Sequence, residues 1–412
     1  MLLLAETLLF YSCNLHQPKE SFLLGSHAGA QQVTGVSRFK FNGQERPLLQ
    51  EERALAVDSF LVVLVLSALP KIFRSEGVSL FKLEASKMVG PWVWATVVAW
   101  TIALVAALVV GVLYTRGSGR CTSTRRLDGK TAIITGASAG IGKETARDLA
   151  GRGARVILAC RNTEKAQKVA NEIIAVTGNQ QVLVRHVDTS NMSSVRKFAY
   201  GILSSENNLH ILINNAGIPG YTTRKLTSEG LEMAMATNHF GHFLLTNLLL
   251  DLLKASAPSR VVNVTSNAHW MCHHLDTDDL NYKWRHFPGW LPSYGQSKLS
   301  NILFTLELSQ RLEGTGVTTN SVHPGVVNTE IFWKEGWKII NFYAVIAAWI
   351  MAKDEKLGAQ PVVYLAVSEE VDNVSGKYFV DCKEAPSSTL AQDPALAKRL
   401  WGASEKLVDL HS

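Results

Sequence analysis

The stretch Thr131-Ala-Ile-Ile-Thr135-Gly136-Ala137-Ser138-Ala139-Gly140-Ile141-Gly142 opens the patterned part of the chain. Its first five residues are mostly aliphatic or β-branched and predict a buried strand, and a helical pattern follows. A glycine-rich turn between a strand and a helix lets the backbone approach a pyrophosphate, whose charge the helix amides and dipole stabilise. The position of the glycines therefore indicates a dinucleotide site. Its candidate cofactor-binding residues are Gly136, Ser138, Gly140, Ile141 and Gly142.

Beyond this turn, short apolar runs alternate with helical stretches as far as the carboxyl end. Strands that alternate with helices form right-handed βαβ units, which build a parallel sheet covered on both faces. We therefore predict an α/β fold with a doubly wound, Rossmann-type parallel sheet of about seven strands. The predicted strands are 131–135, 155–159, 181–186, 211–213, 260–264, 318–322 and 377–380.

Composition bounds the classes of protein to which the chain can belong. Of its 412 residues, 47% are hydrophobic and only 18% are charged, so a membrane segment is to be expected. The net charge of +6 comes from scattered Lys and Arg residues rather than a basic stripe, which argues against a nucleic-acid partner. The five cysteines are widely spaced and form no Cys-x-x-Cys pair, so we expect free thiols.

A stretch of 24 residues from Pro91 to Tyr114 carries no charge. As a helix it would be ~36 Å long, enough to cross a hydrocarbon core of ~30 Å. Trp92, Trp94 and Tyr114 lie near its ends, where aromatic rings prefer the headgroup level. We therefore predict one transmembrane helix over 91–114, with the lipid bilayer as a partner.

Basic residues after the apolar stretch determine its expected orientation. By the positive-inside rule, the domain that follows them faces the cytosol, although basic residues before the stretch reduce the asymmetry. We expect a single-pass protein of the endoplasmic reticulum, with a mitochondrial membrane and the lipid droplet as alternatives. The basic residues are Arg116, Arg120, Arg125, Arg126 and Lys130.

Residues 1–87 have little pattern, and Met88 would be a natural amino terminus. A gene-model or splice extension and a poorly ordered arm both fit this segment. A targeting segment fits less well, because the apolar start lacks a basic region. The expected organisation is an amino-terminal extension (1–87), a transmembrane helix (91–114) and one α/β domain (127–412).

The second predicted strand ends in Leu158-Ala159-Cys160-Arg161-Asn162, without an acidic residue. Sites specific for NAD usually place Asp or Glu here, on the ribose hydroxyls, and such an acid would repel a 2′-phosphate. The guanidinium of Arg161 can instead pair with this phosphate. The pattern favours NADP(H) over NAD(H), and a solvated loop cation is the alternative interpretation.

Two further strand ends supply small or polar residues. Asp188 and Thr189 follow the third strand, where the carboxylate could accept from an adenine amine or cap a helix. Asn215, Ala216 and Gly217 follow the fourth strand. They could stabilise the sheet, lie beside the cofactor, or do both.

The segment Tyr294-Gly295-Gln296-Ser297-Lys298 places a tyrosine and a lysine at i and i+4, on one side of a helix. A phenol is a poor base at neutral pH, and an adjacent ammonium is expected to lower the pKa of Tyr294. Ser266 ends the fifth strand, where its hydroxyl could polarise a carbonyl oxygen. Such a pair alone is common on helix surfaces. Together with the glycine turn and Ser266, it predicts proton transfer beside a bound nicotinamide.

From about Leu127 to the carboxyl end, the chain resembles the short-chain dehydrogenase/reductase family, and within it the membrane-bound, NADP-dependent retinol dehydrogenases that act on all-trans-retinal. The stretches that carry the resemblance are GKTAIITGASAGIGKETA, GARVILACRN, INNAG, TNHFGHFLLT, VVNVTSNAH, YGQSKLSNILF and VHPGVVNTE. The resemblance implies a catalytic set of Asn238, Ser266, Tyr294 and Lys298. Ser266 would orient the substrate, Tyr294 would donate or accept its proton, and Lys298 would also hold the nicotinamide ribose. Asn238 would hold a water that links Lys298 to solvent.

The resemblance also implies an NADP preference, and contacts with the nicotinamide end from Pro324, Gly325 and Thr329. One departure is the distance of 28 positions between Ser266 and Tyr294, so an inserted loop over 269–291 must fold away. The histidines of this loop lack a helical His-x-x-x-His spacing, and the family uses no metal. No metal site is therefore predicted.

The apolar segment 337–351 falls between the last two predicted strands, where this fold carries the lid of its substrate pocket. Its character suits a lipophilic substrate, and a core helix is the alternative interpretation. The expected reaction is hydride transfer between NADP(H) and a lipophilic carbonyl or alcohol, with retinal and retinol as first candidates. Steroid or fatty-aldehyde reduction, and a non-catalytic NADPH-binding membrane protein, remain alternatives. The oligomeric state stays open.

Overall fold

The computed structural model of the chain describes residues 38–41, 44–47, 91–327 and 352–410. These residues belong to two units, with the boundary between Thr96 and Val97. The described part of the first unit includes β1 (Arg38–Phe41) and β2 (Gln44–Pro47), which pair antiparallel. This hairpin was not predicted from the sequence.

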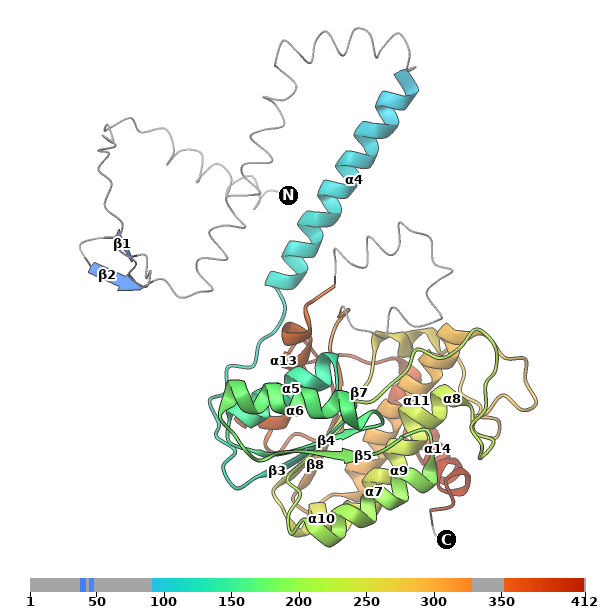
Figure 1. Cartoon of the computed structure of the whole chain (residues 1–412). Coiled ribbons are helices and arrows are strands. Elements are labelled where there is room, and N and C mark those ends of the chain that lie inside the picture. The colour runs from blue at the N-terminus through green and yellow to red at the C-terminus, as the bar shows by residue number, and fades with distance from the viewer. Residues whose placement is uncertain (1–37, 42–43, 48–90, 328–351, 411–412) are drawn as a thin grey trace. The chain divides into compact units, whose positions relative to one another are not determined.

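The second unit is built on an eight-stranded sheet with the order β10-β9-β8-β7-β6-β3-β4-β5 (Figure 1). All neighbouring pairs from β9 to β5 are parallel, as predicted. The seven predicted strands are present to within two residues, and the two-residue β10 is an antiparallel addition at the edge. The strands are β3 (Thr131–Thr135), β4 (Arg155–Cys160), β5 (Val182–His186), β6 (Ile211–Asn214), β7 (Ser259–Val264), β8 (Val317–His323), β9 (Tyr378–Val380) and β10 (Lys383–Glu384).

Helices cover both faces of this sheet, because alternate strand residues are buried on opposite sides. Ile133 and Leu212 pack in one apolar cluster, with α7, α9, α11 and α14. Ile134 and Ile213 pack in the other, with α5, α6 and α13. The helices of the two layers are α5 (Gly140–Gly151), α6 (Thr163–Thr177), α7 (Met192–Ser205), α8 (Met233–Met235), α9 (Gly241–Leu248), α10 (Leu250–Ala255), α11 (Trp290–Arg311), α13 (Glu355–Val367) and α14 (Pro394–Leu407).

Within the described residues, short helices of other types connect these elements. They are the π-helix η1 (Ala236–Phe240) and the 3-10 helices η2 (Asn267–Met271), η5 (Glu369–Val371) and η6 (Thr389–Gln392). The π-helix η1 runs directly into α9, so that this segment changes its backbone hydrogen-bond register.

The predicted apolar helix is present as α4 (Pro91–Arg116), 26 residues long. Among the described residues, no helix has both the length and the hydropathy that a membrane span requires. The transmembrane prediction for 91–114 is therefore not confirmed. The apolar segment 337–351 and Thr329 lie outside the described residues.

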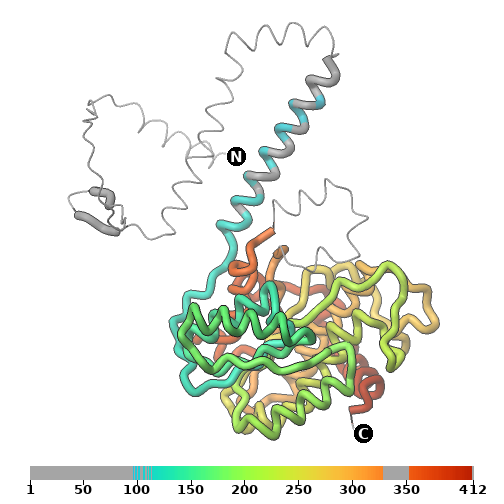
Figure 2. Tube along the Cα trace, viewed as in Figure 1, coloured from blue at the N-terminus to red at the C-terminus, as the bar shows by residue number. Residues whose placement is uncertain are grey.

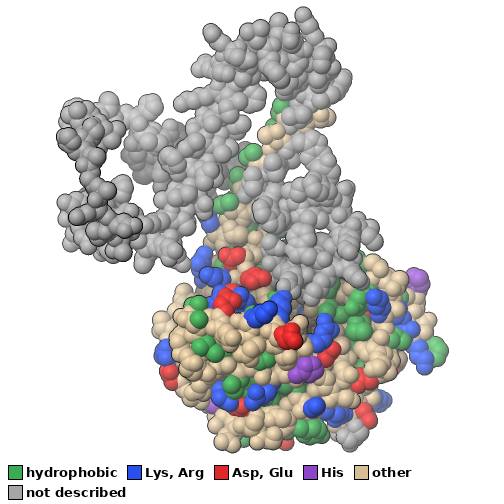
Figure 3. Space-filling view, in the orientation of Figure 1, with side chains coloured by type: hydrophobic (Ala, Val, Ile, Leu, Met, Phe, Trp, Pro, Cys, Tyr) green, Lys and Arg blue, Asp and Glu red, His purple; other side chains and the backbone are tan. Residues whose placement is uncertain are grey.

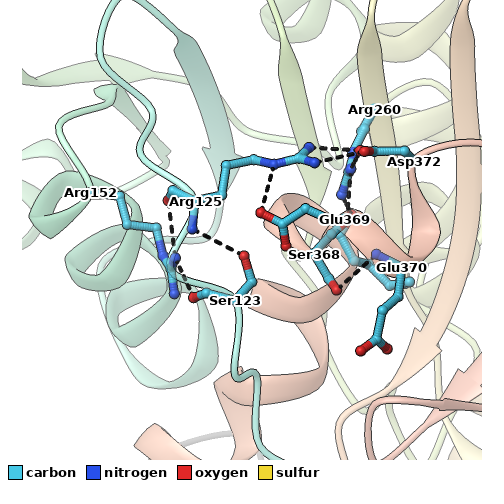
Figure 4. Close-up of polar contacts among 9 residues, drawn as sticks. Ser123, Arg125, Arg152, Arg260, Ser368, Glu369, Glu370 and Asp372 are labelled. Atoms are coloured by element: carbon cyan, nitrogen blue, oxygen red, sulfur yellow. Dashed lines mark hydrogen bonds and ion pairs between the residues drawn. The ribbon is translucent and has the colours of Figure 1, made fainter.

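Figure 2 traces the segment that joins α4 to β3. An arginine ion-pair network attaches this segment to the α/β domain (Figure 4). Arg125 forms two hydrogen bonds of 2.7 Å with the carboxylate of Asp372, and its Nε lies 3.2 Å from Glu369 Oε1. Arg260 also pairs with Asp372. Arg126, one residue further along, pairs with Asp128. Two of the basic residues that were counted for membrane orientation are thus engaged in ion pairs of the fold.

Acidic and basic side chains are mixed on the surface that Figure 3 displays. On this face, the Lys and Arg side chains of the described residues lie among Asp and Glu side chains. The picture fits the scattered distribution of charge along the sequence.

Candidate active site

A cavity of about 800 Å³ lies at the carboxyl ends of the parallel strands. It is lined by residues that follow β3, β4, β5, β6, β7 and β8. The sheet order changes direction at β3, because β4 lies on one side of β3 and β6 on the other. In open α/β sheets, ligands bind at such a switch point.

The glycine turn after β3 forms one wall of the cavity. Gly136 has a φ of +70°, which other residues rarely adopt, and a Cβ at this position would lie 2.9 Å from Ala216 Cα. A Cβ at Gly142 would lie 2.6 Å from Asn215 Nδ2. The turn therefore requires glycine for close backbone approach, and it leads directly into α5, whose amino terminus can bind a phosphate. A dinucleotide fits this geometry.

The turn after β6 is hydrogen-bonded to the end of β3. The backbone N–H groups of Asn215 and Ala216 both donate to Thr135 Oγ1 at 2.9 Å. The Asn215 side chain donates to the Thr135 carbonyl oxygen at 2.8 Å. Asn215, Ala216 and Gly217 also line the cavity, so this turn both stabilises the sheet and lies beside the ligand space.

Three predicted residues lie together where β4 and β5 end. Arg161, Asp188 and Thr189 line the cavity, and Arg161 Nη1 lies 3.8 Å from Asp188 Oδ2. Asp188 also accepts from the backbone and hydroxyl of Ser190, so part of its function is structural. The Arg161 side chain is 68% exposed. Lys165 lines the same end of the cavity and was missed, although it falls in the first turn of the helix that follows Arg161.

Tyr294 and Lys298 of α11 lie in the cavity with Ser266, which follows β7. Lys298 Nζ donates to the Val264 carbonyl oxygen at 3.0 Å and lies 5.5 Å from the centre of the Tyr294 ring. Ser266 accepts from the backbone N–H of Ala268 and so caps η2. Three groups from two elements thus face one ligand space.

The pKa of Tyr294 is raised, whereas the sequence analysis expected it to be lowered. Burial raises the pKa of Tyr294 to about 12, and a hydrogen bond with Ser266 opposes that rise. Burial also lowers the pKa of Lys298 to about 8. The prediction that Lys298 lowers the pKa of Tyr294 is wrong for the protein without a ligand. Desolvation is the main cause of the raised pKa, and Lys298 Nζ is hydrogen-bonded to a backbone carbonyl.

Asn238 lies behind the cavity wall, in the π-helix η1, and is fully buried. Its side chain accepts from the backbone N–H of Ile218 at 2.8 Å and donates to Ser297 Oγ at 2.9 Å. A methyl group at Gly217 would lie 3.3 Å from Asn238 Oδ1 and 3.7 Å from Lys298 Nζ. Asn238 and Lys298 therefore flank Gly217.

Further residues of the cavity wall follow β8 or belong to the inserted loop. Pro324 and Gly325 line the cavity, and their contact with a nicotinamide stays a prediction. Apolar side chains that were not predicted also line it, among them Met271, Trp290 and Leu291. These three belong to the inserted loop or to the start of α11, whose exact path had no signal in the sequence.

The histidines of the inserted loop do not form a metal centre. His269 is buried, its Nδ1 lies 2.8 Å from the Ser266 carbonyl oxygen, and its Nε2 accepts from the backbone N–H of Ser388. Across residues 38–41, 44–47, 91–327 and 352–410, no group of three or more His, Cys, Asp or Glu side chains is arranged to hold a metal ion.

Comparison with known proteins gives the family. The model of the short chain dehydrogenase family matches residues 130–274. Human retinol dehydrogenase 13 is 47% identical over 300 residues, which cover 71% of this chain and 89% of that protein. The chain therefore belongs to the short-chain dehydrogenase family of oxidoreductases.

Two further comparisons agree with this assignment. Human retinol dehydrogenase 11 is 48% identical over 299 residues, which cover 71% of this chain and 90% of that protein. The crystal structure of an uncharacterised protein from Mycobacterium paratuberculosis has 34% identity and a TM-score of 0.57, and it covers 71% of this chain and 98% of that one. The predicted resemblance to retinol dehydrogenases is confirmed, and the chain is an oxidoreductase of a family that binds a nicotinamide dinucleotide.

Proposed function

We propose that the protein is a membrane-anchored enzyme that uses NADPH to reduce a lipophilic carbonyl compound, with retinal as the first candidate. The observation that carries this proposal is one cavity that contains Tyr294, Lys298, Ser266 and the glycine turn. The apolar side chains at its other end suit a lipophilic substrate. The similarity to human retinol dehydrogenases 13 and 11 favours a retinoid within that class.

The proposed mechanism depends on the protonation states of Tyr294 and Lys298 in the cavity without a ligand. A bound nicotinamide would supply the hydride. Tyr294 keeps its proton at neutral pH, since its pKa is about 12, and donates it to the carbonyl oxygen of the substrate. Ser266 orients that oxygen. Lys298, mostly charged at pH 7 because its pKa is about 8, stabilises the phenolate that remains.

For the cofactor, we propose NADP(H) rather than NAD(H). The segment after β4 has no acidic residue, and Arg161 and Lys165 line this end of the cavity. Two cations can bind a 2′-phosphate that an acid would repel.

The test is a competitive turnover assay on the purified full chain. Retinal, a steroid ketone and a fatty aldehyde would each be offered with NADPH and with NADH. We expect the highest kcat/KM for retinal and a preference for NADPH of at least about tenfold. Preferred turnover of the steroid or the fatty aldehyde would reassign the substrate, and turnover of none would remove the enzymatic proposal.

We further propose that residues 91–114 anchor the protein in a membrane, first that of the endoplasmic reticulum, with the α/β domain in the cytosol. The absence of charge over this stretch and the basic residues Arg116 and Arg120 beyond it support the proposal. In cells that express the full chain, the protein should stay with membranes after alkaline extraction. Protease added outside sealed microsomes should digest the α/β domain. Release into the supernatant, or protection of that domain, would contradict the anchor or its orientation.

A further inference from the structure

A buried histidine lies behind the cavity wall and is not among the residues that line it. His242, on α9, is 2% exposed. Its Nε2 lies 2.9 Å from Thr135 Oγ1, and its Nδ1 lies 3.1 Å from the backbone carbonyl oxygen of Asn238. The imidazole therefore joins the end of β3, below the glycine turn, to the π-helix that carries Asn238.

The contacts of His242 permit one tautomer. A carbonyl oxygen only accepts, so Nδ1 must carry the proton and donate it to Asn238. Burial lowers the pKa of His242 to about 4, with the nearby Lys298 acting in the same direction, so the ring is neutral at pH 7. Its Nε2 then has a lone pair and accepts from the hydroxyl of Thr135.

Thr135 extends the same chain of hydrogen bonds to the turn after β6. Its Oγ1 accepts the backbone N–H groups of Asn215 and Ala216, each at 2.9 Å. Its one proton can go to His242 at 2.9 Å or to the Ile213 carbonyl oxygen at 3.4 Å, and the shorter contact is the better hydrogen bond. The donor and the acceptor of each hydrogen bond in this series are therefore determined, from the cavity wall to Asn238.

The carbonyl oxygen at the other end also has a second side-chain donor. Asn301 of α11 donates to the Asn238 carbonyl oxygen at 3.0 Å. The Asn238 side chain, in turn, binds the backbone of Ile218 and the hydroxyl of Ser297. The network thus returns to the turn after β6 and to the helix that carries Lys298.

We propose that His242 is a positioning residue, which holds the Asn215–Ile218 wall of the cavity against Asn238 and so positions the space for the nicotinamide half of the dinucleotide. The inference rests on the proposed function, since it assumes that a nicotinamide dinucleotide binds there. His242 acts through Thr135 and Asn238 and does not touch the ligand.

The experiment compares variants of the full chain that remove the two hydrogen bonds of His242 together or separately. His242→Phe removes both. In His242→Asn the amide can still donate to Asn238, and in His242→Gln it can still accept from Thr135. The matched control is His210→Phe, because His210 Nδ1 accepts from the backbone N–H of Thr131 at 3.1 Å, at the opposite end of β3 from Thr135, and His210 does not line the cavity.

Three quantities would be measured: the Kd of NADPH, the kcat for the carbonyl substrate, and the hydrogen exchange of the Asn215 and Ala216 amides without ligand. In His242→Phe we expect Kd to rise and kcat to fall, each by roughly tenfold, as the loss of a buried hydrogen bond implies. Both amides should exchange faster. At least one of the Asn and Gln variants should recover part of the loss, and both remain informative if the Phe variant does not fold.

Equal effects in His210→Phe would overturn the inference, since the loss would then reflect general destabilisation. Unchanged Kd, kcat and amide exchange in all three His242 variants would overturn it as well. A wild-type chain that binds NADPH but reduces no carbonyl would contradict the proposed function alone, because the Kd and exchange comparisons would still decide the role of His242. A wild-type chain that binds neither NADPH nor NADH would overturn both.

Discussion

At the residue scale, the proposed chemistry depends on a tyrosine that keeps its proton. Replacing Tyr294 by Phe removes the proton donor and little else, because the ring remains. We expect kcat for carbonyl reduction to fall by ~10²-fold or more, with the Kd of NADPH changed less than about threefold. Stopped-flow turnover and NADPH fluorescence titration measure the two quantities.

A second tyrosine provides the control for this prediction. Burial and the hydrogen bond to Glu370 raise the pKa of Tyr364 to about 12 as well, but its hydroxyl lies 2.8 Å from Glu370 and outside the cavity. Tyr364→Phe should leave kcat near that of the wild type. If Tyr294→Phe also kept most of its rate, another group would have to supply the proton.

The pKa of Lys298 predicts how the rate of the reaction depends on pH. Its pKa of about 8 lies below the ordinary value for lysine, so the charge is present at pH 7 and is lost as the pH rises through about 8. Tyr294 stays protonated through this range. We therefore expect kcat/KM for the carbonyl to be flat from pH 6 to 7.5 and to fall above about 8, since kcat/KM reports the free enzyme. A profile that stays flat to pH 10 would exclude a role for this charge.

At the element scale, the segment between β4 and α6 determines which cofactor is preferred. Arg161→Glu should place a negative charge where a 2′-phosphate is proposed to bind. We expect the ratio of kcat/KM for NADPH to that for NADH to fall by ~10- to 100-fold, mainly through KM. Arg185→Glu, on β5 and away from the cavity, is the control and should leave the ratio unchanged. A ratio unchanged in Arg161→Glu would remove Arg161 from cofactor selection.

Elements buried on both faces were the ones that the sequence predicted well. The end residues of β3 and β6 were within one position of the prediction, because strands with continuous apolar runs have sharp polar boundaries. The two-residue β10 and the π-helix η1 were not predicted. Neither is long enough to show a period, and a change of helical register over five residues depends on what packs against it.

At the scale of the whole molecule, four buried histidines among the described residues make the fold sensitive to acid. Burial lowers the pKa of His239 to about 3 and those of His242 and His323 to about 4, and it also lowers the pKa of His269. Below pH 6.5 the unfolded chain binds protons that the folded protein does not, so the free energy of unfolding falls as the pH drops toward 4. Each histidine contributes up to about 1.4 kcal/mol per pH unit.

Thermal unfolding between pH 7.5 and 5.0 measures this effect. We expect Tm to fall on the acid side and His239→Phe to have a shallower dependence, because one of the buried histidines is then missing. A Tm that is constant over this range would mean that the histidines are not buried in neutral form.

Two arginines near the apolar helix have a role in the fold that their position in the sequence did not reveal. Arg125 and Arg126 were expected to orient a membrane helix, yet both form ion pairs within the fold, Arg125 with Asp372 and Arg126 with Asp128. A basic residue next to an apolar stretch can serve either purpose, and only its partners distinguish them. The sequence pattern could not distinguish these two roles for Arg125, because its partner Asp372 lies far along the chain.

The sequence by itself determined the α/β class, the order of its parallel strands along the chain, and the family, since these follow from local periodicity and from short motifs such as the glycine turn and the Tyr294–Lys298 spacing. It also identified residues at the end of each of the strands that border the cavity, because strand ends meet at one edge of a parallel sheet. Only the tertiary structure decided the protonation of Tyr294, the place of Asn238 behind the wall and the contacts of His242. These depend on burial and on partners distant in sequence, and desolvation and hydrogen bonding arise only when the chain is packed.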